Sequence, residues 1–243
     1  MNASRSDVRS LDVPERHWTA WQDPGVFTKN PDIVLFASGK LLCVFNATDS
    51  HWPTEFTRIT IIESQDRGRT WERPRVVHEA LPGSGEEPWI TPRLSLLRDG
   101  RLVIICDQND YRHQHEAQPS GIYAWWSNDE GESWDGPHPT GVPGIEPDRV
   151  RELADGTLLI GTHYMSAATQ KMTEAVLRST DGGKTWGDLS VVASDAVHNY
   201  CEGAVFPLES GRLVCVMRED QHTNYPSYLA LSNDQGRSWT KAR

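Results

Sequence analysis

The octapeptide SQDRGRTW, residues 64–71, indicates the fold because three similar octapeptides follow it in the chain. The other copies are SNDEGESW at 127–134, STDGGKTW at 179–186 and SNDQGRSW at 232–239, at intervals of 63, 52 and 53 residues. Self-similarity at such a spacing is typical of a fold built from one repeated supersecondary unit. We therefore expect the chain to consist of repeated copies of one structural unit.

A second recurring unit precedes each copy. It consists of a short apolar run, a glycine-containing turn (Gly39, Gly100, Gly156 and Gly211) and a strongly apolar run, which together predict a β-hairpin. A third apolar run leads into each octapeptide, and a fourth tends to follow it, as in RPRVVHEA (73–80) and DLSVVAS (188–194). Four short strands per unit, with no long helical pattern, predict an all-β protein: a β-propeller of four-stranded antiparallel blades.

The octapeptide itself reads as a turn between the third and fourth strands. We expect its aspartates to accept backbone N–H bonds and the glycine two residues later to take the positive-φ position. The tryptophan that closes each copy supplies a large apolar ring to fix the turn on its blade. Four equivalent aspartates on four blades cannot surround one substrate, so their predicted role is structural; they are Asp66, Asp129, Asp181 and Asp234.

The pattern S-x-D-x-G-x-[TS]-W resembles the Asp-box, or BNR repeat, of the sialidase (neuraminidase) family, whose members are six-bladed propellers. The resemblance covers residues 25–243 and implies an N-terminal extension at 1–24 followed by blades at about 25–85, 86–143, 144–197 and 198–243. Four blades are visible of an expected six. The chain is then the N-terminal part of a longer enzyme, a ring closed by association through open blade edges, or a degenerate product.

The resemblance also implies a chemistry. A sialic acid carries a carboxylate on its anomeric carbon, so the family uses a tyrosine nucleophile activated by glutamate. Three arginines bind the substrate carboxylate and an aspartate is the acid/base. Glu202, which opens a predicted inner strand, and Arg218, which ends the next strand across the turn at Gly211, match the glutamate and second arginine. The alternative is a salt bridge at the rim.

The first blade departs from the family pattern. The expected Arg-Ile-Pro becomes TKNPDIV (28–34), which puts Lys29 or Asn30 in place of the first arginine. Lysine keeps the charge but loses the bidentate fork of a guanidinium. For the acid, the loop after the second strand offers Asp49 first and Glu55 second, with a plain solvated loop as the alternative.

The second and third blades offer further candidates. Asp107 follows its turn glycine by seven residues, as Arg218 does, and is predicted to bind a sugar hydroxyl, with Arg93 at the start of the inner strand. Arg149 and His163 occupy the corresponding places in the third blade. The nucleophile is expected beyond residue 243, because neither Tyr164 nor Tyr200 occupies the family's position.

Composition excludes several classes of partner. The net charge of −10 argues against nucleic acid or an anionic membrane, and no run of about 18 apolar residues could span a bilayer. The N-terminus lacks a secretory signal, so we expect a cytoplasmic protein. No metal or other cofactor is expected, and the cysteines, which lack ligand spacing, are predicted to be buried free thiols: Cys43, Cys106, Cys201 and Cys215.

Three hypotheses of function follow. The first is an exo-acting glycoside hydrolase of the sialidase type that releases a terminal sialic or related acidic sugar from a glycan with retention. Glu202 would activate the tyrosine, Arg218 would hold the carboxylate and Asp49 would be the acid/base. The second is a non-catalytic propeller that binds glycan or protein. The third, motivated by Lys29 and Asn30, is a glycosidase for a different sugar.

Overall fold

A computed structural model describes residues 17–53, 55–109, 121–221 and 227–243, and these residues form strands and turns without a helix. None of them forms a helix long and apolar enough to cross a membrane. The strands in chain order are β1 (Phe27–Leu35), β2 (Leu41–Thr48), β3 (Thr57–Ser64), β4 (Arg75–Ala80), β5 (Trp89–Leu96), β6 (Leu102–Gln108), β7 (Gly121–Ser127), β8 (Asp135–Pro143), β9 (Arg151–Glu152), β10 (Leu158–Met165), β11 (Met172–Ser179), β12 (Gly187–Ala193), β13 (Tyr200–Pro207), β14 (Leu213–Glu219) and β15 (Ser227–Ser232).

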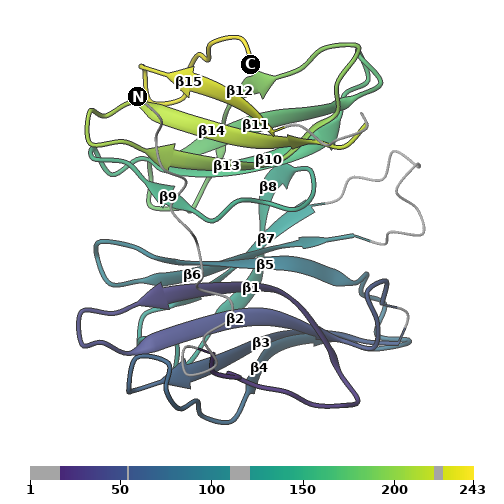
Figure 1. Cartoon of the computed structure of the whole chain (residues 1–243), viewed down its shortest axis with the longest axis vertical. Helices are drawn as coiled ribbons and strands as arrows, with labels where there is room; N and C mark the ends of the chain where they lie inside the picture. The colour runs from purple at the N-terminus through teal and green to yellow at the C-terminus, as the bar shows by residue number, and fades with distance from the viewer. Residues whose placement is uncertain (1–16, 54, 110–120, 222–226) are drawn as a thin grey trace, which may run out of the picture.

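The strands pair with their chain neighbours into four antiparallel sheets, which are the blades of a β-propeller. The first three sheets have four strands each, β1–β4, β5–β8 and β9–β12, and the fourth comprises β13–β15. Leu229 exchanges two backbone hydrogen bonds with Arg243, and the carbonyl of Leu231 accepts one from Thr240, which extends the fourth sheet beyond β15. Figure 1 shows the four sheets stacked along the long axis of the molecule. The predicted all-β propeller fold is confirmed.

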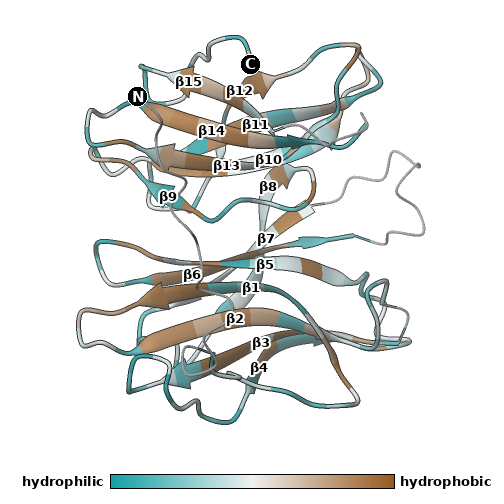
Figure 2. Cartoon of the chain, in the orientation of Figure 1, coloured by the Kyte–Doolittle hydropathy of each residue, from teal (hydrophilic) through white to brown (hydrophobic). Residues whose placement is uncertain are grey.

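The blades pack face to face because alternate residues of a strand point to opposite faces of its sheet. On β6, Leu102 and Ile104 pack against the first blade, whereas Val103 and Ile105 pack against the third. The third and fourth blades share a core that includes Leu159 and Val205. Strand interiors are accordingly apolar on both faces, which Figure 2 shows as brown strand centres between more hydrophilic turns.

The octapeptide folds as predicted. In its first copy the backbone N–H of Thr70 donates to Asp66 Oδ1 (2.8 Å), the Thr70 hydroxyl donates to Oδ2 (2.7 Å), and Gly68 has φ of 87°. Trp71 Nε1 donates to the carbonyl of Gly68 (3.1 Å). The other three copies repeat these bonds. Hydrogen bonds from the Ser or Thr hydroxyl lower the pKa of each aspartate, which stays ionised in its turn.

The octapeptide also joins neighbouring blades, which its sequence does not reveal. The carbonyl of the residue before its glycine accepts a hydrogen bond from a cation of the preceding blade. Lys40 Nζ donates to the carbonyl of Glu130 (3.0 Å), and Arg101 Nη1 donates to that of Gly182 (3.0 Å). Both cations directly follow a hairpin glycine, so the hairpins of the first and second blades each bind the octapeptide of the next blade.

The four cysteines are free and buried, as predicted: Cys43, Cys106, Cys201 and Cys215. Burial raises the pKa of each thiol, in the case of Cys43 to about 11. The thiols therefore serve as small apolar side chains of the core.

Candidate functional site

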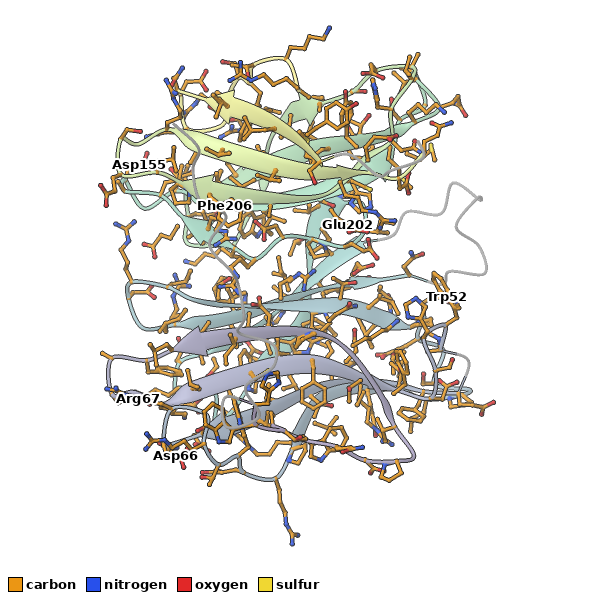
Figure 3. The ribbon with its side chains drawn as sticks, viewed as in Figure 1. Trp52, Asp66, Arg67, Asp155, Glu202 and Phe206 are labelled. Atoms are coloured by element: carbon orange, nitrogen blue, oxygen red, sulfur yellow. The ribbon has the colours of Figure 1, made fainter. Side chains whose placement is uncertain are left out.

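The blades have two distinct ends. Figure 3 shows Glu202 and Trp52 at one end of the sheets, and Asp66, Arg67 and Asp155 at the opposite end. We call the end that carries Glu202 the mouth. The octapeptide of the first blade thus lies far from Glu202, in agreement with a structural role for its aspartate.

Every blade enters its first strand at the mouth through a non-glycine residue in the left-handed conformation. These residues are Asn30, Thr91, Glu146 and Glu202, with φ of 53°, 55°, 47° and 50°. In three of the blades the pairing register with the second strand shifts at this residue. Such conformations cost on the order of 1–3 kcal/mol each and are concentrated at functional sites. The structure thus marks one equivalent mouth position in each of four blades.

A second set of equivalent residues lies opposite these bulges, on the second strand of each blade. Each follows its hairpin glycine by seven residues and pairs with the residue before the left-handed one; the set is Asn46, Asp107, His163 and Arg218. Three of them face the next blade. The backbone N–H of Thr91 donates to Asn46 Oδ1 (3.0 Å), and that of Glu202 donates to His163 Nδ1 (3.1 Å). The backbone N–H of Glu146 favours the ionised form of Asp107, but neither carboxyl oxygen accepts a hydrogen bond from the described residues.

Glu202 and Arg218 meet at the mouth. Arg218 pairs across the strands with Cys201, and its Nη1 forms an ion pair with Glu202 Oε1. Both side chains are solvent-accessible, with 42% of Glu202 and 46% of Arg218 exposed. Burial lowers the pKa of Arg218, but the Glu202 carboxylate raises it by more, so the net change is an increase. The two residues predicted to share a site are therefore in contact.

Lys29 and Asp107 lie close together on the other side of the mouth. Lys29 Nζ donates to the carbonyl of His51 (2.8 Å); burial lowers its pKa, against the charges of Asp107, Glu146 and Asp49. The Asp107 carboxyl is fully buried, and neither oxygen has a hydrogen-bond partner among the described residues. Burial and the Glu146 carboxylate raise its pKa well above the ordinary value, so it holds its proton more strongly than a solvated aspartate.

The two acid candidates of the first blade differ in position. Asp49 Oδ1 accepts a long hydrogen bond from the backbone N–H of Phe56 (3.4 Å), and its charge acts on Lys29. Glu55 is exposed and lines a separate hollow with residues 80–88. Trp52, in the same loop as Asp49, is 58% exposed at the mouth and offers an aromatic face to solvent.

A cavity of about 410 Å³ is lined by residues from the innermost segments of all four blades. Its lining includes Arg93, Glu146, Arg149 and Glu202. Arg93 Nε donates to the carbonyl of Pro147 (3.3 Å), and its charge favours the ionised form of Asp107. Arg93 and Glu202 therefore share one cavity, while Arg149 forms an ion pair with Asp32.

Sequence reasoning missed Glu146. Its Oε2 lies 3.9 Å from His163 Nε2, and its charge acts on both Lys29 and Asp107. The available signal was its place in the repeat, since Glu146 and Glu202 open equivalent units. Tyr200, by contrast, donates its hydroxyl to Asp195 (2.9 Å), and burial and this contact raise its pKa. That environment opposes formation of a nucleophilic phenolate.

The mouth thus combines groups suited to glycoside chemistry. Glu202 is an accessible carboxylate, and Asp107 is a buried carboxyl that favours its protonated form. Arg218, Lys29 and Arg93 supply positive charge for an anionic ligand. Among the described residues, no group of three His, Cys, Asp or Glu side chains is arranged to hold a metal ion.

Comparison with known proteins gives one family and one curated relative. The profile of the BNR repeat-like domain matches residues 98–243. A sialidase from Bacteroides fragilis (strain YCH46) is 24% identical over 272 residues, which cover 95% of this chain and 46% of the relative. The chain spans about half the length of this relative.

Solved structures share the fold at low sequence identity. A Dyadobacter fermentans protein of unknown function aligns with a TM-score of 0.76 and 19% identity, covering 92% of this chain and 70% of its own. The Streptococcus pneumoniae sialidase NanB aligns at 0.71 and 14%, covering 93% and 53%. A Penicillium chrysogenum α-L-arabinanase aligns at 0.67 and 19%, covering 89% and 66%. The fold is therefore one that glycoside hydrolases of different specificity share.

Proposed function

Because the chain belongs to the BNR repeat-like domain family, we propose that it forms part of the substrate site of an exo-acting glycoside hydrolase. The substrate is a glycan that ends in a sialic or related acidic sugar, which the enzyme releases with retention. The match to a sialidase supports this class of substrate. The blades provide the rigid frame, and the residues of the mouth provide the chemistry.

The observation that carries the proposal is the accessible pair of Glu202 and Arg218. An ion pair this exposed contributes about 0–1 kcal/mol to stability, so the fold does not require it. A substrate carboxylate could replace Glu202 as the partner of the Arg218 guanidinium, which binds carboxylates through two parallel N–H donors. Glu202, released from Arg218, would then act as a base toward the nucleophile. The proposed mechanism requires a tyrosine supplied from outside residues 1–243.

The remaining candidates have roles consistent with their surroundings. Lys29 and Arg93 would add positive charge at the mouth, and Asp49 would donate a proton to the leaving group. Asp107, which the sequence assigned to a sugar hydroxyl, is fully buried and does not reach the solvent, so its proposed role is to act on the charge of Lys29. Trp52 would offer its exposed ring to an apolar sugar face.

Lys29 favours a second candidate function, a glycosidase for a different sugar. Its ammonium is a single point charge, and one of its donors is engaged by the His51 carbonyl, so it cannot grip a carboxylate as a guanidinium does. The arabinanase of the same fold belongs to this kind of enzyme. A terminal sugar without a carboxylate on its anomeric carbon, either neutral or uronic, would fit such a site.

The test is hydrolysis by the protein at its natural length. A fluorogenic α-sialoside is compared with neutral and uronic glycosides, for wild type, Glu202→Gln and Arg218→Ala. We expect sialoside turnover, and a loss of about 10²-fold or more in kcat/KM for each variant. The matched control is the exposed pair Arg58–Glu79, whose nitrogen and oxygen lie 3.0 Å apart; Arg58→Ala and Glu79→Gln should leave kcat/KM unchanged.

Each alternative has its own outcome. Turnover of a neutral or uronic glycoside without turnover of the sialoside selects the second candidate. Binding on a glycan array with no turnover, insensitive to Arg218→Ala, selects a non-catalytic propeller. Sialoside turnover that survives both Glu202→Gln and Arg218→Ala contradicts the proposed site.

A further inference from the structure

His163 on β10 and Glu174 on β11 lie directly opposite each other in the third blade and form a cross-strand pair. Both side chains are buried, and both reach the fourth blade. His163 Nδ1 accepts the backbone N–H of Glu202 (3.1 Å), and Glu174 Oε2 accepts the backbone N–H of Gly203 (3.1 Å). One cross-strand pair thus binds two successive backbone donors of β13.

These two donors lie inside the bulge that shapes the mouth. Glu202 has φ of 50°, and the pairing between β13 and β14 shifts register between Cys201 and Ala204. A left-handed non-glycine residue persists only where its surroundings impose the conformation. The hydrogen bonds to Glu202 and Gly203 come from the neighbouring blade, so blade packing helps to impose it.

The absence of a side chain at Gly203 leaves room for the carboxyl of Glu174. A Cβ atom at position 203 would lie 2.4 Å from Glu174 Cδ, well below any real contact distance. The glycine therefore lets the Glu174 carboxyl approach the backbone of β13.

The protonation state of His163 suits its acceptor role. Burial, with a contribution from Arg218, lowers its pKa to about 4, so the imidazole is neutral at neutral pH. Because Nδ1 accepts a hydrogen bond, we assign the proton to Nε2, which faces Glu146 Oε2 at 3.9 Å. The charged and titratable groups that face the ring are Glu146 and Glu174 of the third blade and Glu202 and Arg218 of the fourth.

We propose that His163 and Glu174 are positioning residues, which hold the Glu202 backbone so that its carboxylate is presented to Arg218 and to the substrate. This inference rests on the proposed role of Glu202 in hydrolysis. It adds a specific function for two buried side chains that touch no substrate. A misplacement of about 1 Å in a reacting group lowers rates by about 10²-fold, so the orientation of Glu202 has a measurable effect.

The equivalent contact elsewhere in the chain suggests a conservative substitution for His163. Between the first and second blades, Asn46 Oδ1 accepts the N–H of Thr91, the residue equivalent to Glu202. Asn Oδ1 and His Nδ1 are both bonded to Cγ, so His163→Asn keeps an acceptor in the same place. His163→Leu removes the acceptor, and Asn46→Leu removes the equivalent one between the first two blades.

The experiment combines amide hydrogen exchange, followed by NMR, with steady-state kinetics on the α-sialoside. In His163→Leu we expect exchange of the Glu202 amide to rise at least about tenfold, and kcat to fall at least about tenfold with little change in KM. His163→Asn should keep both close to wild type. Asn46→Leu should raise exchange at Thr91 and leave the Glu202 amide unchanged. If His163→Leu does not fold, His163→Gln, whose acceptor lies one bond farther out, replaces it.

Three results would overturn the inference. Exchange of the Glu202 amide could remain at the wild-type rate in His163→Leu, His163→Asn could behave like His163→Leu, or exchange could rise while kcat stays constant. Failure of the proposed function looks different, because wild-type protein would then turn over no glycoside. In that case the exchange rates of the Glu202 and Gly203 amides still show whether His163 and Glu174 of the third blade restrain this segment of backbone.

Discussion

The carboxylate of Asp32 on the first blade forms an ion pair with the guanidinium of Arg149 on the third. Asp32 also accepts the backbone N–H of Leu94 on the second blade (2.9 Å). Asp148 makes the equivalent contact between the third and fourth blades, where it accepts the N–H of Val205 (2.9 Å). Aspartates of the first and third blades thus each bind the backbone of the following blade, and Asp32 links three blades.

Substitution of Asp32 by alanine should destabilise the protein by about 2–4 kcal/mol. It leaves the Leu94 N–H without its acceptor and the partly buried Arg149 without its partner. Equilibrium urea unfolding at pH 7 measures the loss. The exposed pair of Arg58 and Glu79 is the control, because Glu79→Gln should cost less than about 1 kcal/mol. Equal losses in the two variants would argue against a special role for Asp32.

Gly183→Ala should destabilise the protein more than Gly156→Ala. Both glycines are left-handed, with φ of +92° and +89°, so each substitution carries a strain of about 1–2 kcal/mol. Only at Gly183 would the new Cβ meet a neighbour, since Trp126 Cη2 of the second blade would lie 2.5 Å away. Overpacking adds about 1–3 kcal/mol. Thermal unfolding of the two variants checks the difference, and the same unfolding temperature for both would refute it.

His163 makes stability depend on pH in a defined direction. Burial lowers its pKa to about 4, so between pH 6.5 and 4 the unfolded chain binds a proton that the folded protein does not. Stability from this group is present above pH 6.5 and is lost as pH falls, by about 3 kcal/mol in all. Urea unfolding of wild type and His163→Asn across this range isolates the effect. Wild type should lose stability relative to the variant toward pH 4, and parallel curves would contradict the assignment.

Asp107→Asn should stabilise the protein at pH 8. The carboxyl is buried without a hydrogen-bond partner among the described residues, and burial raises its pKa well above the ordinary value. A carboxyl with a raised pKa stabilises the fold most below the unfolded pKa, and this contribution is lost as pH rises through the folded value. Asparagine has no charge to bury, so its advantage should grow from pH 4 to pH 8. A urea midpoint below that of wild type at pH 8 would show that ionised Asp107 has a stabilising partner.

The sequence predicted the scaffold well because its determinants are local. The turn around Asp66 is closed by bonds within eight residues, and the hairpin at Gly39 depends on one left-handed glycine. Counting from the hairpin glycines also placed Asp107 and Arg218 at equivalent positions, which the strand register confirms. Only some residues of the candidate site could be predicted from local sequence patterns. Glu146 was missed because its neighbours, Lys29 and Asp107, come from other blades.

The repeated four-stranded blades of this protein follow from local sequence, because turn chemistry and strand alternation act over a few residues. The residues that meet at the mouth are set by contacts between blades. The stacking of blades brings Asp32 to Arg149, 117 positions apart, and sets His163 beneath the backbone of Glu202. Burial in that packing then decides which groups are charged, because desolvation disfavours the ionised forms of His163 and Asp107.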